Sequence, residues 1–219
     1  MRSLVVLGAM LVLATSTARA EGIVSARYEA PVERYGHFAL GRPHEYARVV
    51  AATDTGRSLA LELPDDEVFE DLAPRLARLT EDGPTYLLAI VSARGAGARL
   101  ALLGLRGDVL EIMAQSAPIG TPNRWLNPVG VADLDGDGVA EIAGVTTPHI
   151  GGVQRVYHRE GERLVELASL AGFSNHVYRS PEIELSRPAR IDGRTQLLVP
   201  DTSRRSRRVI AFDGDRQEA

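Results

Sequence analysis

Three aspartates on alternate residues constrain this chain more than any other feature of its sequence. Asp133, Asp135 and Asp137 are followed by Gly138, and Glu141 closes the window. A cation such as calcium takes about six to eight oxygen ligands, and carboxylates on alternate residues reach one cation only when the backbone coils around it. Without that cation the charges would repel one another. The stretch therefore predicts a calcium loop built on the carboxylates of Asp133, Asp135, Asp137 and Glu141.

The residues around the loop distinguish between two structural frames. In an EF-hand the twelfth loop position carries a bidentate glutamate, but counted from Asp133 that position is Gly144. The flanks, residues 129–132 and 142–147, are short, apolar or β-branched, and lack a helical period, so they predict a strand on each side. The loop resembles the Asp-x-Asp-Gly-Asp-Gly-x-x-Glu signature of FG-GAP/VCBS repeats, the calcium-loop blades of integrin-like β-propellers. The resemblance implies that the ligands are Asp133, Asp135, Asp137, the Val139 carbonyl and Glu141.

Asp-Gly pairs recur along the chain at one spacing. Asp82-Gly83 and Asp192-Gly193 lie 55 residues before and after Asp137-Gly138. A fixed period of this size is typical of repeat architectures, and an apolar run follows each pair at the same offset. The outer copies keep the turn but lose the ligands, since Arg78 and Thr80 stand where the central copy has Asp133 and Asp135. We therefore expect one metal-binding repeat among degenerate ones.

Short apolar runs separated by turn residues predict an all-β fold. With the resemblance, they imply a single small β-propeller over residues 21–219, with four blades of four antiparallel strands. The last unit is one strand short, so we expect the strand beginning at Ile23 to complete the fourth blade, which would remove exposed sheet edges. Five smaller blades, or an open partial propeller that dimerises, are the alternatives. Within residues 65–79 the pattern allows one helical turn.

The first 20 residues predict export. Arg2 precedes an apolar run from Leu4 to Ala14, and a small-x-small site ends at Ala20, so residues 1–20 are expected to be a signal peptide cleaved after Ala20. The mature chain is then periplasmic or extracellular and is not inserted in the membrane. There is no cysteine, so the fold must form without disulfides. The net charge of −4 gives no indication of a nucleic-acid partner.

A second group of candidates follows successive outer strands at corresponding places. In a propeller these turns approach one face, where a Trp beside an Arg, together with histidines, offers an aromatic and polar surface for a ligand or partner. Packing between blades is the alternative role. The five histidines have no zinc-site spacing, and most of them are expected at surface or loop positions. The residues of this predicted face are His37, Arg124, Trp125, Asn175 and His176.

The function expected from the sequence is that of an exported calcium-binding module that binds a protein or glycan without catalysis. No Gly-x-Ser-x-Gly elbow, phosphate-binding glycine loop or His-Glu-x-x-His motif is present. The alternative is an enzyme of hydrolase or lyase type, because one fold can carry unrelated chemistries. That alternative requires His37, His176, Arg124 and Arg34 to converge.

Overall fold

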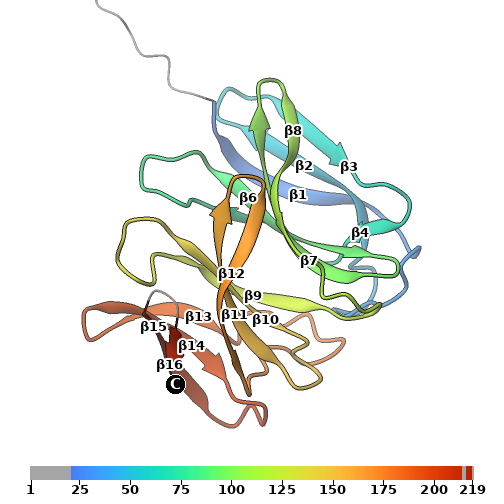
Figure 1. The fold of residues 1–219 in the computed structure, drawn as a ribbon. Helices are drawn as coiled ribbons and strands as arrows, with labels where there is room; N and C mark the ends of the chain where they lie inside the picture. Colours follow the sequence, from blue (N-terminus) through green and yellow to red (C-terminus); the bar gives the residue numbers. More distant parts are fainter. Residues whose placement is uncertain (1–20, 214–215, 219) are drawn as a thin grey trace, which may run out of the picture.

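The computed structural model describes residues 21–213 and 216–218, which form strands joined by turns and loops (Figure 1). The expected all-β class is confirmed. The predicted signal peptide, residues 1–20, lies outside the described residues. Within the described part of the chain, no helix is long and apolar enough to cross a membrane. The expected helical turn within residues 65–79 is wrong, because this segment forms two short strands, β4 (Glu67–Phe69) and β5 (Arg75–Ala77).

Most strands belong to one curled sheet of 12 strands, which forms a half-barrel (Figure 1). Its order is β1-β2-β4-β6-β7-β8-β12-β11-β10-β9, with β3 paired to β2 and β5 paired to β6. Its other strands are β1 (Ile23–Pro31), β2 (Tyr46–Thr53), β3 (Ser58–Glu62), β6 (Tyr86–Ala93), β7 (Gly97–Arg106), β8 (Val109–Ser116), β9 (Leu126–Ala132), β10 (Glu141–Thr146), β11 (Val153–Glu160) and β12 (Arg163–Ala171).

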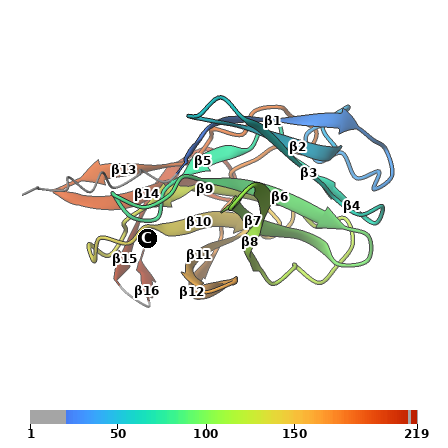
Figure 2. The ribbon, with the colours of Figure 1, turned by 90° about the horizontal axis from the view of Figure 1, so that it is seen from above.

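A smaller sheet of four strands completes the described fold. It has the order β13-β14-β15-β16 and lies beyond β9 and β10 in Figure 2. Apolar side chains from β14 and β15, including Leu197, Val199 and Ile210, pack with Val129 and Val145 of the large sheet. The strands are β13 (Arg187–Ile191), β14 (Arg194–Pro200), β15 (Arg207–Asp213) and β16 (Arg216–Glu218).

The prediction of four separate blades is wrong. Propeller blades are separate sheets that contact one another through side chains, whereas here backbone pairing runs across the expected borders. β4 pairs with both β2 and β6. β12 pairs in parallel with β8 through Arg163↔Gln115 and Leu164↔Ser116. These two junctions join three of the expected units into one sheet.

The expected closure by the N-terminal strand is also wrong. β1 pairs antiparallel with β2, from Ile23↔Thr53 to Pro31↔Tyr46. The C-terminal unit supplies its own fourth strand, because Arg216–Glu218 pair back onto residues 211–213 as β16. The strand expected from the N terminus to complete the fourth unit is therefore provided by the C terminus, as β16.

The period of 55 residues does mark real local structure. The three Asp-Gly pairs lie just before β6, β10 and β14, and each of these strands pairs antiparallel with the strand before it. Strands β6 and β7 are buried on both faces. Leu88 and Ile90 face the core shared with β9 and β10, while Leu87 and Ala89 face the core shared with β1 and β2. The hairpin β9–β10 packs into the first of these cores and, on its other side, into the core shared with β14 and β15, and its two ends carry the candidate sites.

Candidate functional site

The predicted calcium loop joins β9 to β10 and brings three carboxylates together. Oxygens of Asp133, Asp135 and Glu141 lie within 4.8 Å of one another. The two carboxylate oxygens of Asp133 accept hydrogen bonds from the backbone N–H groups of Gly136 (2.7 Å) and Gly138 (3.1 Å). Both glycines have positive φ, +86° and +88°, which allows the backbone to coil around the carboxylates.

Glu141 anchors this cluster from the first position of β10. It is 3% exposed, and its Oε2 accepts a hydrogen bond from the Leu134 N–H at 2.9 Å. Burial, followed by repulsion from Asp135 and Asp137, raises the pKa of Glu141. The donors are all oxygens, which suits a hard cation such as calcium or magnesium. Asp133, Asp135 and Glu141 could therefore hold such a cation, although nothing in the structure identifies it as calcium.

The two other predicted ligands, Asp137 and the Val139 carbonyl, are not part of this carboxylate cluster. Asp137 Oδ1 accepts a hydrogen bond from the Val139 N–H at 2.7 Å. The Val139 side chain is exposed. The structure therefore gathers three of the predicted carboxylates, and the roles of Asp137 and of the Val139 carbonyl stay predictions.

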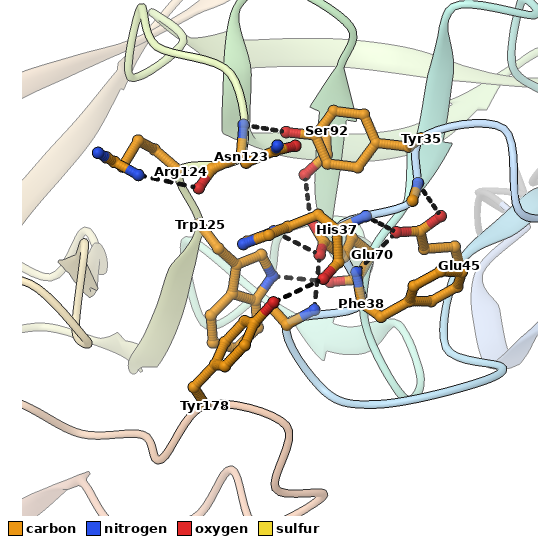
Figure 3. Close-up of polar contacts among 12 residues, drawn as sticks. Tyr35, His37, Phe38, Glu45, Glu70, Ser92, Asn123, Arg124, Trp125 and Tyr178 are labelled. Carbon is orange, nitrogen blue, oxygen red and sulfur yellow. Dashed lines mark hydrogen bonds and ion pairs between the residues drawn. The ribbon is translucent and has the colours of Figure 1, made fainter.

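A cavity of about 440 Å³ opens at the other end of the β9–β10 hairpin. A smaller cavity of about 240 Å³ elsewhere is lined by Arg155 and Glu166, which already pair with each other. Segments far apart in the sequence meet at the larger one, and Figure 3 shows part of this meeting. We call it the aromatic pocket. It is lined by His37, Asn123, Arg124, Trp125, Thr147, His149, Ile150 and Tyr178.

The structure brings together most of the predicted face. His37, Arg124 and Trp125 line the aromatic pocket, and His176 contacts His149 just behind its wall. Asn175 does not reach the pocket lining. It is fully buried, and its side-chain N–H groups donate to the Ser186 hydroxyl (2.9 Å) and the Asn127 carbonyl (3.1 Å). Its role is to hold loops together.

His37 is oriented by a fully buried carboxylate (Figure 3). Its Nδ1 lies 2.8 Å from Glu70 Oε1. His37 Nδ1 makes no hydrogen bond of good geometry despite this short distance, so we interpret the contact as mainly electrostatic. A proton on Nδ1 avoids opposing lone pairs on the two atoms. Glu70 also accepts hydrogen bonds from the Ala39 N–H (2.9 Å) and the Ser92 hydroxyl (2.7 Å). The other ring nitrogen of His37 points away from Glu70 in Figure 3.

A second buried carboxylate shapes the backbone that carries His37. Glu45 precedes β2 and is fully buried. Its oxygens accept hydrogen bonds from the consecutive N–H groups of Gly36 (2.9 Å), His37 (2.8 Å) and Phe38 (2.8 Å). Such a set of donors to one buried charge is costly to lose, so the loop holds one conformation.

His149 and His176 form a hydrogen-bonded pair. His149 Nε2 lies 2.7 Å from His176 Nδ1, and His176 Nε2 lies 2.8 Å from the Ser180 carbonyl oxygen. Since a carbonyl only accepts, His176 carries its proton on Nε2, and His149 Nε2 must donate to His176 Nδ1. Burial, and then the neighbouring His176, lower the pKa of His149 to about 4. Burial likewise lowers the pKa of His176.

Trp125 connects the two groups. It is 1% exposed, and its Nε1–H donates to the Glu70 carbonyl oxygen at 2.9 Å. The His149 ring lies parallel to the indole, with centroids 6.0 Å apart, and the His176 ring centroid lies at 4.7 Å. Trp125 is also the only tryptophan of the chain. Its fluorescence therefore reports on this pocket alone.

Strained backbone is concentrated around the pocket. Seven described residues other than glycine have positive φ, and four of them line the pocket or adjoin a lining residue. Positive φ is unfavourable for residues with a side chain, and such strain is typical of functional sites. The four are Phe38 (51°), Asn123 (54°), Thr147 (49°) and Arg179 (64°).

Several important residues were missed from the sequence. Glu70 directly follows the short strand β4, the place that corresponds to the predicted face in its unit, so a signal for it existed. Glu45 and Tyr178 had no such signal. His149 and His176 lie in loops, as expected for most of the histidines, but His176 is fully buried, and the two are 27 residues apart in the sequence. No motif of fixed spacing could have paired them.

Comparisons with known proteins add no assignment to this geometry. No protein-family model matches the chain, and a search of curated proteins finds no match. The resemblance of residues 133–141 to FG-GAP/VCBS loops stays a prediction. The functional conclusion therefore depends on the two sites themselves.

Proposed function

We propose that this chain is a binding protein whose aromatic pocket takes a small ligand, free or at the end of a protein or glycan partner. The observation that carries the proposal is the convergence at this cavity of four segments, which contribute His37, Arg124 with Trp125, His149, and Tyr178. Concave sites that combine aromatic walls with a few fixed polar groups are typical of ligand pockets. The buried supports Glu45 and Glu70 preorganise the wall, which reduces the entropic cost of binding.

We further propose that the loop at Asp133, Asp135 and Glu141 holds calcium in a structural role. In the part of the chain described, these carboxylates have no ion pair with an arginine or histidine. Calcium loops of extracellular modules bind in the range of about 10⁻⁴ to 10⁻³ M. A loop of that affinity suits an exported protein, in keeping with the signal peptide predicted from the sequence.

Fluorescence of Trp125 tests the binding proposal directly. The full chain is titrated with a chemically diverse panel of organic acids, amines, nucleosides and sugars, with emission and melting temperature as readouts. We expect at least one class to shift both, and Tyr178→Ala to weaken that response. Val109→Ala, which removes exposed apolar surface on β8 outside the pocket lining, is the matched control. A panel without any response would overturn the proposal.

The enzyme alternative has one observation in its favour, the contact between His37 and Glu70. A histidine held by a carboxylate can act as a general base. Three of the four residues that this alternative requires lie at or beside the pocket. Arg34 does not, because its guanidinium donates to the backbone oxygens of Glu67 and Leu63. Turnover of a bound ligand that is lost in His37→Gln, with binding retained, would favour catalysis over binding alone.

A further inference from the structure

The polar groups of the aromatic pocket carry an inference about the class of ligand, which rests on the proposed binding function. We propose that the pocket takes an acidic sugar, meaning a hydroxylated ring with a carboxylate, either free or as the terminal unit of a glycan. Three features of the pocket support this class, namely its charge, its unpaired acceptors and its apolar wall.

The charge of the pocket favours an anion. Arg124 is the one permanently charged residue of the lining, and no aspartate or glutamate lines the cavity. The Arg124 guanidinium forms no ion pair among the described residues, and Nη1 donates to the Asn123 carbonyl oxygen at 3.4 Å. The carboxylates behind the wall, Glu45 and Glu70, are fully buried and bonded to protein donors. A guanidinium in this setting suits a planar carboxylate, which it binds with two parallel hydrogen bonds.

The histidines supply hydrogen-bond acceptors. Because His149 Nε2 donates to His176, the neutral His149 ring carries a lone pair on Nδ1, and no described residue is hydrogen-bonded to that atom. His37 lines the pocket and holds its Nδ1 toward Glu70, so in the neutral ring Nε2, which points away from Glu70 (Figure 3), is an acceptor. Two acceptors without protein partners need donors on the ligand. Hydroxyl groups supply such donors, whereas a simple carboxylate does not.

The remaining wall is apolar and accessible. The Tyr178 and Ile150 side chains are 44% and 62% exposed, and both line the pocket. The C–H face of a sugar ring packs well on surfaces of this kind, whose aromatic face is electron-rich. A neutral sugar would leave Arg124 unused, and an aromatic acid would leave the histidine acceptors unpaired. An acidic sugar uses all three features at once.

The test compares ligands that carry these features separately. The full chain is titrated with glucuronate and galacturonate, with the neutral sugars glucose and galactose, with acetate, and with glucose 6-phosphate, following Trp125 emission and heat release. We expect the uronates to bind at least about tenfold more tightly than the neutral sugars, since a hydrogen bond between charged groups is worth that factor or more. Acetate and glucose 6-phosphate should also bind more weakly than the uronates.

Substitutions test whether Arg124 and His149 are the groups that bind the uronate. Arg124→Gln should reduce uronate affinity to that of the neutral sugar, and Arg27→Gln, which changes an exposed arginine on β1, should leave it unchanged. His149→Phe should weaken uronates and neutral sugars alike. Circular dichroism confirms that each variant is folded. Tighter binding of a trigalacturonate than of galacturonate would identify a glycan end as the source, and equal binding would identify the free acid.

Three outcomes would overturn the inference. Neutral sugars, acetate or glucose 6-phosphate binding as tightly as the uronates would exclude the acidic sugar class. No response to any of these compounds, with a response to another class in the broad panel, would exclude the acidic sugar class but leave the proposed binding function in place. No response to any compound would overturn the inference and the proposed function together.

Discussion

The acidic loop and the aromatic pocket lie at opposite ends of one hairpin, and they are assembled in opposite ways. Asp133 directly follows β9 and Glu141 begins β10, whereas Trp125 directly precedes β9 and Thr147 follows β10. The loop draws its carboxylates from nine consecutive residues. The pocket draws its lining from residues between 37 and 178. One site is local in the sequence, and the other exists only in the folded chain.

The two sites also treat negative charge differently. The carboxylates of the loop form no ion pair with a described arginine or histidine, although Arg190 and Arg194 line the hollow beside them, and burial raises the pKa of Glu141. The pocket region instead buries Glu45 and Glu70 completely and surrounds each with hydrogen-bond donors. We infer that a cation from solution balances the negative charge of the loop, whereas hydrogen-bond donors of the protein itself stabilise the carboxylates behind the pocket. Substitutions should therefore act on ion binding in one region and on global stability in the other.

The largest effect is expected from Glu70→Leu. This substitution leaves the Ala39 N–H, the Ser92 hydroxyl and the His37 ring without their buried acceptor, and breaking such a network costs about 3 to 5 kcal/mol. Chemical denaturation measures the loss. Glu62→Leu is the control, because Glu62 forms an exposed ion pair with Arg48, and surface pairs of this kind contribute little to stability. An equal loss of unfolding free energy in both variants would show that the bonds to Glu70 do not stabilise the pocket.

The second largest effect is expected from acidification, which should lower the stability of the folded chain through His149. The pKa of His149 is about 4 in the folded chain against an ordinary 6.5, so the unfolded chain binds more protons between these values. Stability therefore falls as the pH drops through this window. Allowing for partial solvent access, we expect a loss of about 2 kcal/mol. Melting curves from pH 7 to pH 4 should show a smaller decline for His149→Gln, and parallel declines would contradict the burial of the pair.

The strands could be predicted from sequence far better than their assembly. Apolar runs after each Asp-Gly pair correspond to β6, β10 and β14, because alternation and turn residues act over a few neighbours. The joining of the units depends on β4 bridging two strands and on two residue pairs between β8 and β12. Contacts this short leave no pattern in the sequence. The resemblance of one loop therefore suggested separate blades where the backbone forms a continuous sheet.

The same distinction holds for the sites. The clustering of Asp133, Asp135 and Glu141 could be predicted because they lie close together in the sequence. Asp137 Oδ1 accepts a hydrogen bond from the Val139 N–H, and the role of Asp137 as a ligand stays a prediction. For the pocket, the sequence indicated His37 and Trp125 through their repeated position. It could not indicate that His149 would pair with His176, since that contact depends on how the loops after β10 and β12 meet. Tertiary sites of this kind require the fold.

Calcium should stabilise the loop region by a smaller amount. At ten times the dissociation constant, a ligand that binds only the folded chain adds about 1.4 kcal/mol. Thermal melting with calcium and with a chelator measures this gain. Asp135→Asn should abolish it, whereas Asp82→Asn, in the degenerate copy of the loop, should leave it intact. A gain that persists in Asp135→Asn would place the ion elsewhere, and one that also disappears in Asp137→Asn would mean that Asp137 turns inward when the ion binds.

The smallest expected effect separates the loop backbone from its ion. Gly138 has φ +88°, and a Cβ there would meet no atom within 4 Å, so Gly138→Ala costs only backbone strain, about 1 kcal/mol in chelator. Gly107, in the turn between β7 and β8, has φ +58° and equally open space, so Gly107→Ala should cost a similar amount. Because the Gly138 N–H donates to Asp133, Gly138→Ala alone should also reduce the gain from calcium. Equal calcium gains in the two variants would mean that the ion does not depend on this turn.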